Sequence, residues 1–409
     1  MRSRILAFGL SAAVAITLVG CKDDPEDAPL VSSRASRGHE NERDTTAFVN
    51  AYPSAVGTRL DDCQTCHRGG TFRTTAAKTL SKNACDHCHL VIHPSSELAN
   101  PQPTGFDPLP AGYADTLNAY GAAYLAAGGA DRGKADLTAL DAADSDGDGF
   151  ANGVEIADGK YPGDPSSKPG QVTAPQKAFT RPALQALARH AEFLLANSNK
   201  QQYDEYATYG GVRVRDLLVA AGVDLADPAL TGVTVVAPDG YLKSIPIAKV
   251  VAAYPAGVFH AGLDVATLGA TCGFVSYPSP LPAGLVDGGA IPGEQWLVLA
   301  YDRDGAALDT SNLDPTSGKI NGEGPYRLVV PQSTPGWPDR GSQYSPTTCG
   351  DGRDYAAAFD HNAGDMVRGV IAVRVDPLPA GYEDFDAKNG GWAYVEDASV
   401  IVYGHGVAP

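Results

Sequence analysis

A short pattern of two cysteines and a histidine, Cys-x-x-Cys-His, occurs twice in this 409-residue chain. The first copy runs from Cys63 to His67 and the second from Cys85 to His89. Two thiols at this spacing on a helical turn can reach both vinyl groups of one porphyrin, and the histidine that follows can bind its iron. The pattern therefore predicts two covalently attached haems. Their thioether residues would be Cys63, Cys66, Cys85 and Cys88, and their proximal iron ligands His67 and His89.

Zinc is the main alternative use of these cysteines. Because 18 residues separate Cys66 from Cys85, the two pairs also match the spacing of a four-cysteine zinc site. Such a site does not require a histidine directly after each pair, whereas this chain has one after both. A dithiol redox pair is a second alternative, but it would need a βαβ context that the polar, Gly-rich surroundings do not supply. The two histidines favour haem.

The first 20 residues have the character of a secretory signal. Arg2 and Arg4 precede an apolar run that is too short for a comfortable transmembrane helix. The run closes at Leu18-Val19-Gly20-Cys21, which resembles the lipobox of bacterial lipoproteins and implies cleavage before Cys21 and lipidation of its thiol. A plain signal peptide cleaved nearby is the alternative. We expect a protein that is anchored by lipid in the cell envelope of a Gram-negative-type bacterium.

Residues 21–47 are polar and lack apolar periodicity, so we expect a flexible tether from the membrane. Lys22 rather than Asp follows the lipobox cysteine, which favours the outer membrane, on either its periplasmic or its extracellular side. The formal net charge of −17 falls to −19 once Arg2 and Arg4 are removed. Nucleic acid is therefore not an expected partner.

The seven cysteines divide into three groups. Cys21 is assigned to lipid and four cysteines to haem, which leaves Cys272 and Cys349. Because disulfides persist in exported proteins, we predict a Cys272–Cys349 disulfide. Two buried free thiols are the alternative.

The number of methionines limits the residues that could be the sixth ligand of each iron. Once the signal is removed, Met366 is the one remaining methionine, so histidine–methionine ligation could serve at most one haem. We expect bis-histidine ligation. His93 lies on nearly the same helical face as the preceding motif histidine, so it would serve the first haem, and His39 the second. His361 and His405 are further candidates.

An acidic, Gly-containing segment from Asp144 to Glu155 matches the twelve-residue calcium loop. Glycine at the sixth position makes the turn, and the flanks are shorter than those of a full EF-hand. A lone loop of this kind is typical of a structural calcium site, and an acidic turn without metal is the alternative. The expected ligands are Asp144, Asp146, Asp148, the carbonyl of Phe150, Asn152 and Glu155.

The chain as a whole predicts an α+β multidomain protein. Residues 48–170 would form a small, mostly helical or irregular dihaem domain that contains the calcium loop, and residues 171–409 a mixed α+β domain. Pro and Gly in residues 160–178 predict an interdomain linker, and apolar spacing predicts a helix from about Pro182 to Asn197. A short helix is expected after Val212, and strands at residues 233–236, 297–301, 326–331, 370–375 and 400–403.

Four segments in the C-terminal half resemble the molybdopterin-binding domain of sulfite-oxidase-like proteins: Gly211 to Val223, Asp239 to Ile247, Leu299 to Tyr301 and Gly324 to Pro331. The resemblance covers about residues 200 to 340 and implies that fold. That family holds molybdenum through a cysteine that precedes these segments, and residues 90–271 contain none. We therefore expect the fold without molybdopterin or its metal.

The sequence Gly322-Glu323-Gly324-Pro325, taken with the haem motifs and the calcium loop, resembles the diheme c-type proteins named for a GEGP motif. These are exported bacterial proteins, and the resemblance implies electron transfer without a defined substrate. The leading hypothesis is therefore a lipid-anchored dihaem cytochrome. It would pass electrons between redox proteins, such as other cytochromes or a respiratory reductase, in the periplasm or at the outer membrane.

Two competing hypotheses remain. One is an oxidoreductase whose C-terminal domain binds a pterin or small substrate and passes electrons to the haems. The other is a surface-assembly protein in which the haem segment is secondary.

Overall fold

The structure is a computed structural model. It describes residues 43–61, 65–67, 70–74, 79–82, 106–107, 117–128, 136–200, 203–238, 241–309, 311–313, 320–343, 349–385, 394–395 and 397–408. The expected signal segment 1–20, the lipidation site Cys21 and most of the tether 21–47 lie outside these residues. None of the helices within them is both long enough and apolar enough to cross a membrane.

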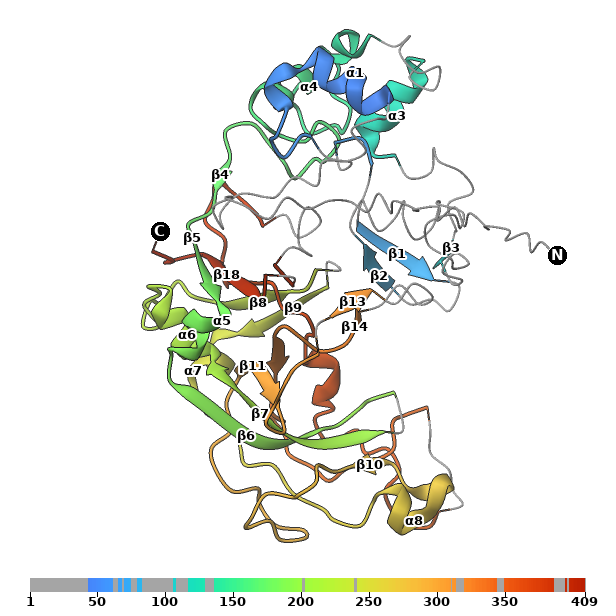
Figure 1. The fold of residues 1–409 in the computed structure, drawn as a ribbon, viewed down its shortest axis with the longest axis vertical. Coiled ribbons are helices and arrows are strands. Elements are labelled where there is room, and N and C mark those ends of the chain that lie inside the picture. Colours follow the sequence, from blue (N-terminus) through green and yellow to red (C-terminus); the bar gives the residue numbers. More distant parts are fainter. Residues whose placement is uncertain are drawn as a thin grey trace, which may run out of the picture. The chain divides into compact units, whose positions relative to one another are not determined.

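Short helices form the first described part of the chain (Figure 1). Their apolar faces meet in one core, which includes Phe48, Leu60, Tyr120 and Tyr161. The elements are α1 (Arg43–Ala51), α3 (Ala119–Ala126), α4 (Asn152–Ala157) and the 3-10 turns Pro53–Ala55 and Leu137–Leu140. The same stretch of sequence contains an antiparallel sheet in the order β2-β1-β3, made of β1 (Gly70–Thr74), β2 (Thr79–Lys82) and β3 (Phe106–Asp107).

The first of two larger sheets has five strands in the order β5-β18-β16-β8-β9. Strands β16 and β18 are parallel, and the other neighbours are antiparallel. Valines are paired across its centre, as at Val235 and Val373, because β-branched side chains pack well on a pleated surface. The strands are β5 (Gln176–Thr180), β8 (Gly232–Val236), β9 (Leu242–Pro246), β16 (Ala372–Asp376) and β18 (Ser399–Gly404).

The second large sheet has β7 and β11 at its centre, in the order β10-β7-β11-β12, with β6 also paired to β7 and β15 to β11. Its strands are β6 (Arg189–Ala196), β7 (Asp204–Arg213), β10 (Val275–Ser276), β11 (Val298–Arg303), β12 (Ala306–Ala307) and β15 (Arg327–Val329). Two further pairs are β4 (Val172–Thr173) with β17 (Tyr382–Glu383), and β13 (Asn312–Leu313) with β14 (Ile320–Asn321).

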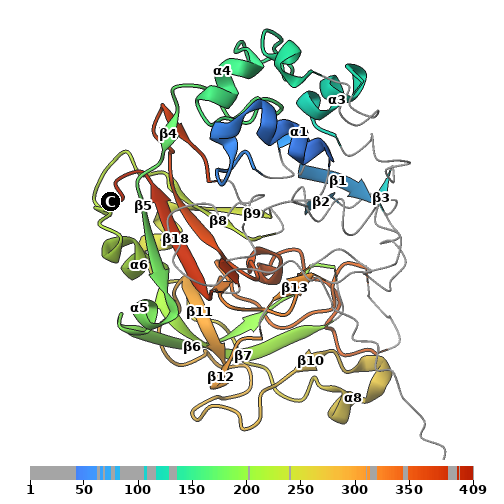
Figure 2. The same cartoon turned by 45° about the horizontal axis from the view of Figure 1, so that its top comes forward.

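The two large sheets lie next to each other (Figure 2), and residues of both contribute to one apolar core. Val233 and Val402 enter it from the first sheet, and Tyr209 and Leu328 from the second. Leu217 of α6 fills the same core. The remaining helical elements are α5 (Arg181–Gln185), α6 (Val214–Ala220), α7 (Ile247–Val251), α8 (Val265–Cys272) and the 3-10 turn Asn362–Asp365. The described chain is thus a mixed α+β protein with more sheet than helix.

The predicted strands are confirmed as β8, β11, β15, β16 and β18, and the short helix after Val212 is confirmed as α6. The predicted helix from Pro182 to Asn197 is wrong, because α5 is followed at once by β6. Residues of β6 enter two different cores, Leu194 one and Leu195 the other. A strand that is buried on both faces loses the polar alternation that identifies a strand, so its apolar residues imitate helical spacing.

The expected linker 160–178 is held in place rather than extended. Lys160 and Ser167 are buried within it. Lys160 Nζ donates to a carboxylate oxygen of Glu383 at 2.7 Å, and Ser167 Oγ donates to the other at 3.1 Å. The segment also contains β4 and the start of β5. The domain boundary near residue 170 stays a prediction.

Candidate metal and cofactor sites

The described part of the first Cys-x-x-Cys-His motif comprises residues 65–67. Thr65 Oγ1 donates to the Leu60 carbonyl at 2.7 Å, and the Cys66 carbonyl accepts from the backbone N–H of Asn118 at 2.9 Å. His67 forms an isolated antiparallel bridge with Leu117 and is 8% exposed. The motif is therefore held against the chain that leads into α3.

Helix α3 approaches the motif very closely. A Cβ atom added to Gly121 would lie 2.0 Å from the Cys66 carbonyl oxygen, so only glycine allows this contact. Tyr120 beside it is fully buried, and Cys66 packs partly buried against the core that contains Tyr120 and Tyr124. Burial, with smaller contributions from Tyr52 and Cys66, raises the pKa of Tyr120 above its usual value. The motif thus lies beside an aromatic, desolvated surface.

Most of the other predicted haem residues lie outside the described part of the chain. These are Cys63, Cys85 and Cys88 for attachment, His89 as proximal ligand, and His93 and His39 as distal ligands.

Three further candidate ligands are described, and each has contacts within the C-terminal part. Met366 is 5% exposed in the shared core, and its sulfur accepts from Arg327 at 3.7 Å. His361 Nε2 lies 3.0 Å from a carboxylate oxygen of Asp339, and His405 Nε2 lies 2.8 Å from one of Asp227. These contacts give each side chain a structural role apart from haem.

The calcium-type loop brings its first three aspartates together. Ligand oxygens of Asp144, Asp146 and Asp148 all lie within 4.8 Å of one another. Asp144 shapes the turn, because its Oδ1 accepts from Gly147 N at 2.7 Å and its Oδ2 from Gly149 N at 3.0 Å. These bonds to backbone N–H groups, that of Gly149 first, hold the pKa of Asp144 below its usual value.

Glu155 lies on α4, where it is fully buried and interacts with the charges of all three aspartates. Both of its carboxylate oxygens, together with Oδ2 of Asp146 and Oδ2 of Asp148, are buried without a hydrogen-bond partner among the described residues. Lys168 Nζ is 3.7 Å from Asp148 Oδ2. Unpaired buried carboxylates are costly, and clustered carboxylate oxygens are the ligands that calcium prefers. The described loop therefore fits a calcium ion.

Burial and neighbouring charges raise the pKa of two carboxyl groups in this loop. Burial is the main cause that raises the pKa of Glu155 to about 8, and the charges of the loop aspartates add to it. Burial likewise raises the pKa of Asp146 to about 6. Both shifts are expected where several carboxylates share a desolvated site, and a divalent cation would relieve the repulsion.

Two other predicted ligands occupy the same loop. Asn152 is fully buried; its Oδ1 accepts from Ser145 N at 3.1 Å, and its Nδ2 donates to the Leu140 carbonyl at 2.8 Å. It thereby fastens the start of α4 to the segment before the loop. Phe150 is 37% exposed, and its N–H donates to Asp148 Oδ1 at 2.8 Å. Their predicted roles as calcium ligands stay predictions.

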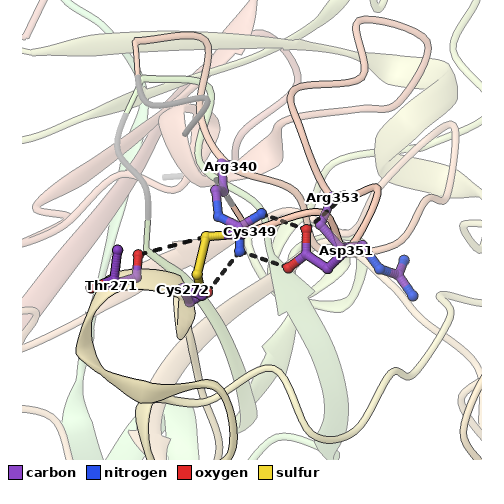
Figure 3. Close-up of a disulfide and its surroundings, with 6 residues drawn as sticks. All are labelled: Thr271, Cys272, Arg340, Cys349, Asp351 and Arg353. Carbon is purple, nitrogen blue, oxygen red and sulfur yellow. Dashed lines mark hydrogen bonds and ion pairs between the residues drawn. A yellow bond between two sulfur atoms is a disulfide. The ribbon is translucent and has the colours of Figure 1, made fainter. Parts of the chain in front are cut away.

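The predicted Cys272–Cys349 disulfide is confirmed, with the two Cα atoms 5.7 Å apart (Figure 3). Arg340 lies beside it and is 1% exposed. Its two terminal nitrogens each donate at 2.7 Å to one oxygen of Asp351, and Nη2 also donates to the Cys272 carbonyl at 2.7 Å. The bond from Arg340 is the main cause that lowers the pKa of Asp351. One buried guanidinium thus supports both ends of the disulfide-closed loop.

The GEGP sequence contains a charged contact that the sequence analysis missed. Glu323 accepts from Arg303 at 3.1 Å and from the buried Arg327 at 2.5 Å, and Arg327 also donates to Tyr209. Glu323 is therefore the counter-ion of a buried arginine. The four-residue spacing between Glu323 and Arg327 was not a usable signal, because it brings side chains together on a helix, whereas Arg327 begins strand β15.

The described chain thus offers a part of one Cys–His motif, an acidic loop and a disulfide-closed loop. A scan against models of known protein families finds no match for the chain, and a search of curated proteins finds none either.

Proposed function

We propose that the protein is a lipid-anchored dihaem c-type cytochrome that transfers electrons between redox proteins in the periplasm or at the outer membrane. The observation that carries this proposal is the presence of two Cys-x-x-Cys-His motifs within residues 63–89. The surroundings of Cys66 and His67 support it, because Cys66 packs against a buried aromatic core and His67 is 8% exposed.

The predicted residues would attach the two haems and bind their irons. Cys63 and Cys66 would attach the first haem, Cys85 and Cys88 the second. His67 and His89 would bind the two irons from the proximal side, with His93 and His39 as the distal ligands. Haem supplies one-electron redox chemistry when bound. The buried side chains around His67 would exclude water, which is one of the means by which proteins tune haem potentials.

The loop from Asp144 to Glu155 would hold calcium as a structural support of the same small core. Ile156, next to Glu155 on α4, belongs to that core, as does Leu137 just before the loop. Calcium binding would therefore stabilise the elements that support residues 65–67. Attachment of lipid at Cys21 would place the haems near the membrane, where other cytochromes or a respiratory reductase would exchange electrons with them.

The test is a pyridine haemochrome spectrum of the exported protein, together with analysis of iron, zinc, calcium and molybdenum. We expect two haems and one calcium ion per chain, with no zinc or molybdenum. A matched variant, Cys63→Ala with Cys66→Ala, should carry one haem. A colourless protein with zinc in place of iron, obtained from a host competent in cytochrome maturation, would falsify the proposal. One molybdenum per chain would instead support the pterin-dependent oxidoreductase.

A further inference from the structure

Asn118 lies just before α3 and uses its side chain in two directions. Its Oδ1 accepts from Gly121 N at 2.9 Å, which caps the helix. Its Nδ2 donates to the Thr65 carbonyl at 3.1 Å and lies 3.5 Å from the His67 carbonyl. One amide group therefore connects the first turn of α3 with the carbonyls on both sides of Cys66.

Backbone contacts of the same segment complete the arrangement. The N–H of Asn118 donates to the Cys66 carbonyl at 2.9 Å, and Leu117 pairs with His67. The carbonyls of three successive motif residues, 65 to 67, are thus directed at Asn118. Buried carbonyls need such partners, because an unpaired polar group is costly to bury.

The surroundings restrict Asn118 to this conformation. The residue is 9% exposed. On its other side lies Gly163, where an added Cβ would come within 2.5 Å of the Asn118 side-chain oxygen. Tight packing on both sides leaves the amide little freedom to turn away from the motif.

We infer that Asn118 is a positioning residue for the first haem, a role that rests on the proposed function. The peptide planes on either side of Cys66 set the directions in which its thiol and the His67 ring leave the backbone. Asn118 holds the Thr65 carbonyl and contacts the His67 carbonyl through its side-chain amide, and it holds the Cys66 carbonyl through its backbone N–H, so it fixes the thioether and the proximal imidazole relative to each other. Groups that orient a ligand in this way are commonly as important to a metal site as the ligand.

The variants below separate the positioning of the motif by Asn118 from its capping of α3. Asn118→Asp keeps the shape and the capping oxygen but has no amide to donate, whereas Asn118→Ala loses both. Asp264→Ala is the matched control, because Asp264 caps α8 through Thr267 N at 2.7 Å and is remote in sequence from the motif. All are made in the full chain with Cys85→Ala and Cys88→Ala, so that absorbance reports the first haem alone. Calcium titration shows whether the small core is folded.

We expect Asn118→Asp to lower the fraction of chains with covalently attached, low-spin haem about five- to tenfold, as the loss of a net hydrogen bond implies. Asn118→Ala should lower this fraction at least as much, and Asp264→Ala should change neither haem attachment nor the absorption spectrum. Wild-type attachment and spectrum in an Asn118→Asp protein that binds calcium normally would overturn the positioning role and leave the dihaem assignment standing. An unaltered chain without haem would overturn both.

Discussion

The hydroxyl of Tyr52 donates to Oδ1 of Asp141 at 2.5 Å, and its oxygen lies 3.1 Å from the Leu137 carbonyl oxygen. Asp141 also accepts, through its backbone carbonyl, from Gly153 N at 3.0 Å. Tyr52 directly follows α1, whereas Asp141 and Gly153 lie on opposite sides of the acidic cluster. The phenol therefore connects the acidic loop, Asp144 to Glu155, with the core beside the first Cys-x-x-Cys-His motif.

Replacing Tyr52 with phenylalanine should weaken this connection. Tyr52→Phe keeps the ring contact with Phe48, whose centroid is 5.0 Å away, but leaves the buried side of Asp141 without its donor. We expect a loss of about 1–3 kcal/mol in the free energy of unfolding and a weaker calcium affinity. Thermal unfolding and calcium titration measure the two. Tyr203→Phe, at a tyrosine that is 61% exposed, is the control, and equal behaviour of the two variants would contradict the expectation.

Removal of calcium should destabilise the wild-type protein, and Glu155→Gln should abolish that dependence. At a calcium concentration of 100 times Kd, binding stabilises the folded state by about 2.7 kcal/mol. The variant loses a bidentate ligand, yet without calcium it should be no less stable than wild type. Burial raises the pKa of Glu155 to about 8, so the wild-type carboxyl must take up a proton on folding at neutral pH, whereas glutamine needs none. Melting temperatures with calcium and with a chelator measure this. Glu294→Gln, at an exposed glutamate, should retain the full calcium effect.

Gly121→Ala should disrupt the first motif without a change of charge. The added Cβ would lie 2.0 Å from the Cys66 carbonyl oxygen, so α3 and the motif must move apart. We expect loss of about 1–3 kcal/mol of stability and lower occupancy of the first haem. Gly364→Ala is a suitable control, since its Cβ would meet nothing within 4 Å. Mass spectrometry measures the number of haems per chain in the Gly121→Ala protein. Two haems per chain would argue against the close contact between α3 and the motif.

Glu383 should make stability sensitive to acid. Burial acts to raise its pKa, but the charges of Arg59 and Lys160 outweigh burial and hold the pKa below its ordinary value of 4.5. A carboxyl with a lowered pKa in the folded state stabilises the protein above the unfolded value and loses this contribution as the pH falls through the folded one. The stabilisation should therefore be complete at neutral pH, decline as the pH falls below the ordinary value of 4.5, and be lost below the lowered pKa of the folded state.

The matching variant is Glu383→Gln, which leaves the two cations without their counter-ion. We expect about 3 kcal/mol less stability at pH 7 and a smaller difference from wild type in acid. Asp397→Asn, at an exposed carboxyl, is the control. Denaturant unfolding at several pH values measures the difference in unfolding free energy between wild type and Glu383→Gln. If this difference grows as the pH falls, the pKa of Glu383 is raised rather than lowered in the folded protein.

The disulfide should contribute most of the stability of the loop between residues 272 and 349. The double variant Cys272→Ala with Cys349→Ala opens a loop of 77 residues, which we expect to cost about 2–4 kcal/mol. Arg340 would remain bonded to Asp351, so the fold should persist. Chemical reduction of the wild-type protein should lower its melting temperature as much as the double substitution does. An unchanged melting temperature after both treatments would contradict this contribution.

Local chemistry was predictable where the pattern depends on side chains close together in the sequence. The spacing of Asp144, Asp146 and Asp148 identified a loop that gathers these carboxylates, and the cysteine count identified the disulfide. Strands such as β8 and β18 were predictable from their β-branched residues. The loop and the strands were predictable because neighbouring residues carry the signal, whereas the disulfide, whose cysteines are 77 positions apart, was predictable because two cysteines remained after the others had been assigned.

What the sequence did not predict depends on partners distant in the chain. β6 resembled a helix because both of its faces are buried, a property set by two separate cores. The role of Asn118 depends on residues more than 50 positions away, and Glu383 contacts Lys160 across 223 positions. A sequence pattern cannot show that a polar side chain will be buried against a distant carbonyl or cation.

The place of β18 in its sheet affects the order in which the protein is completed. This strand, Ser399–Gly404, lies between β5 and β16, and among the described strands β5 has no other partner in that sheet. Under the proposed function, export amino end first would expose the Cys-x-x-Cys-His motifs to haem attachment long before the final residues arrive, so that attachment could precede closure of the sheet. A prematurely terminated chain would display two open strand edges to proteases and to aggregation.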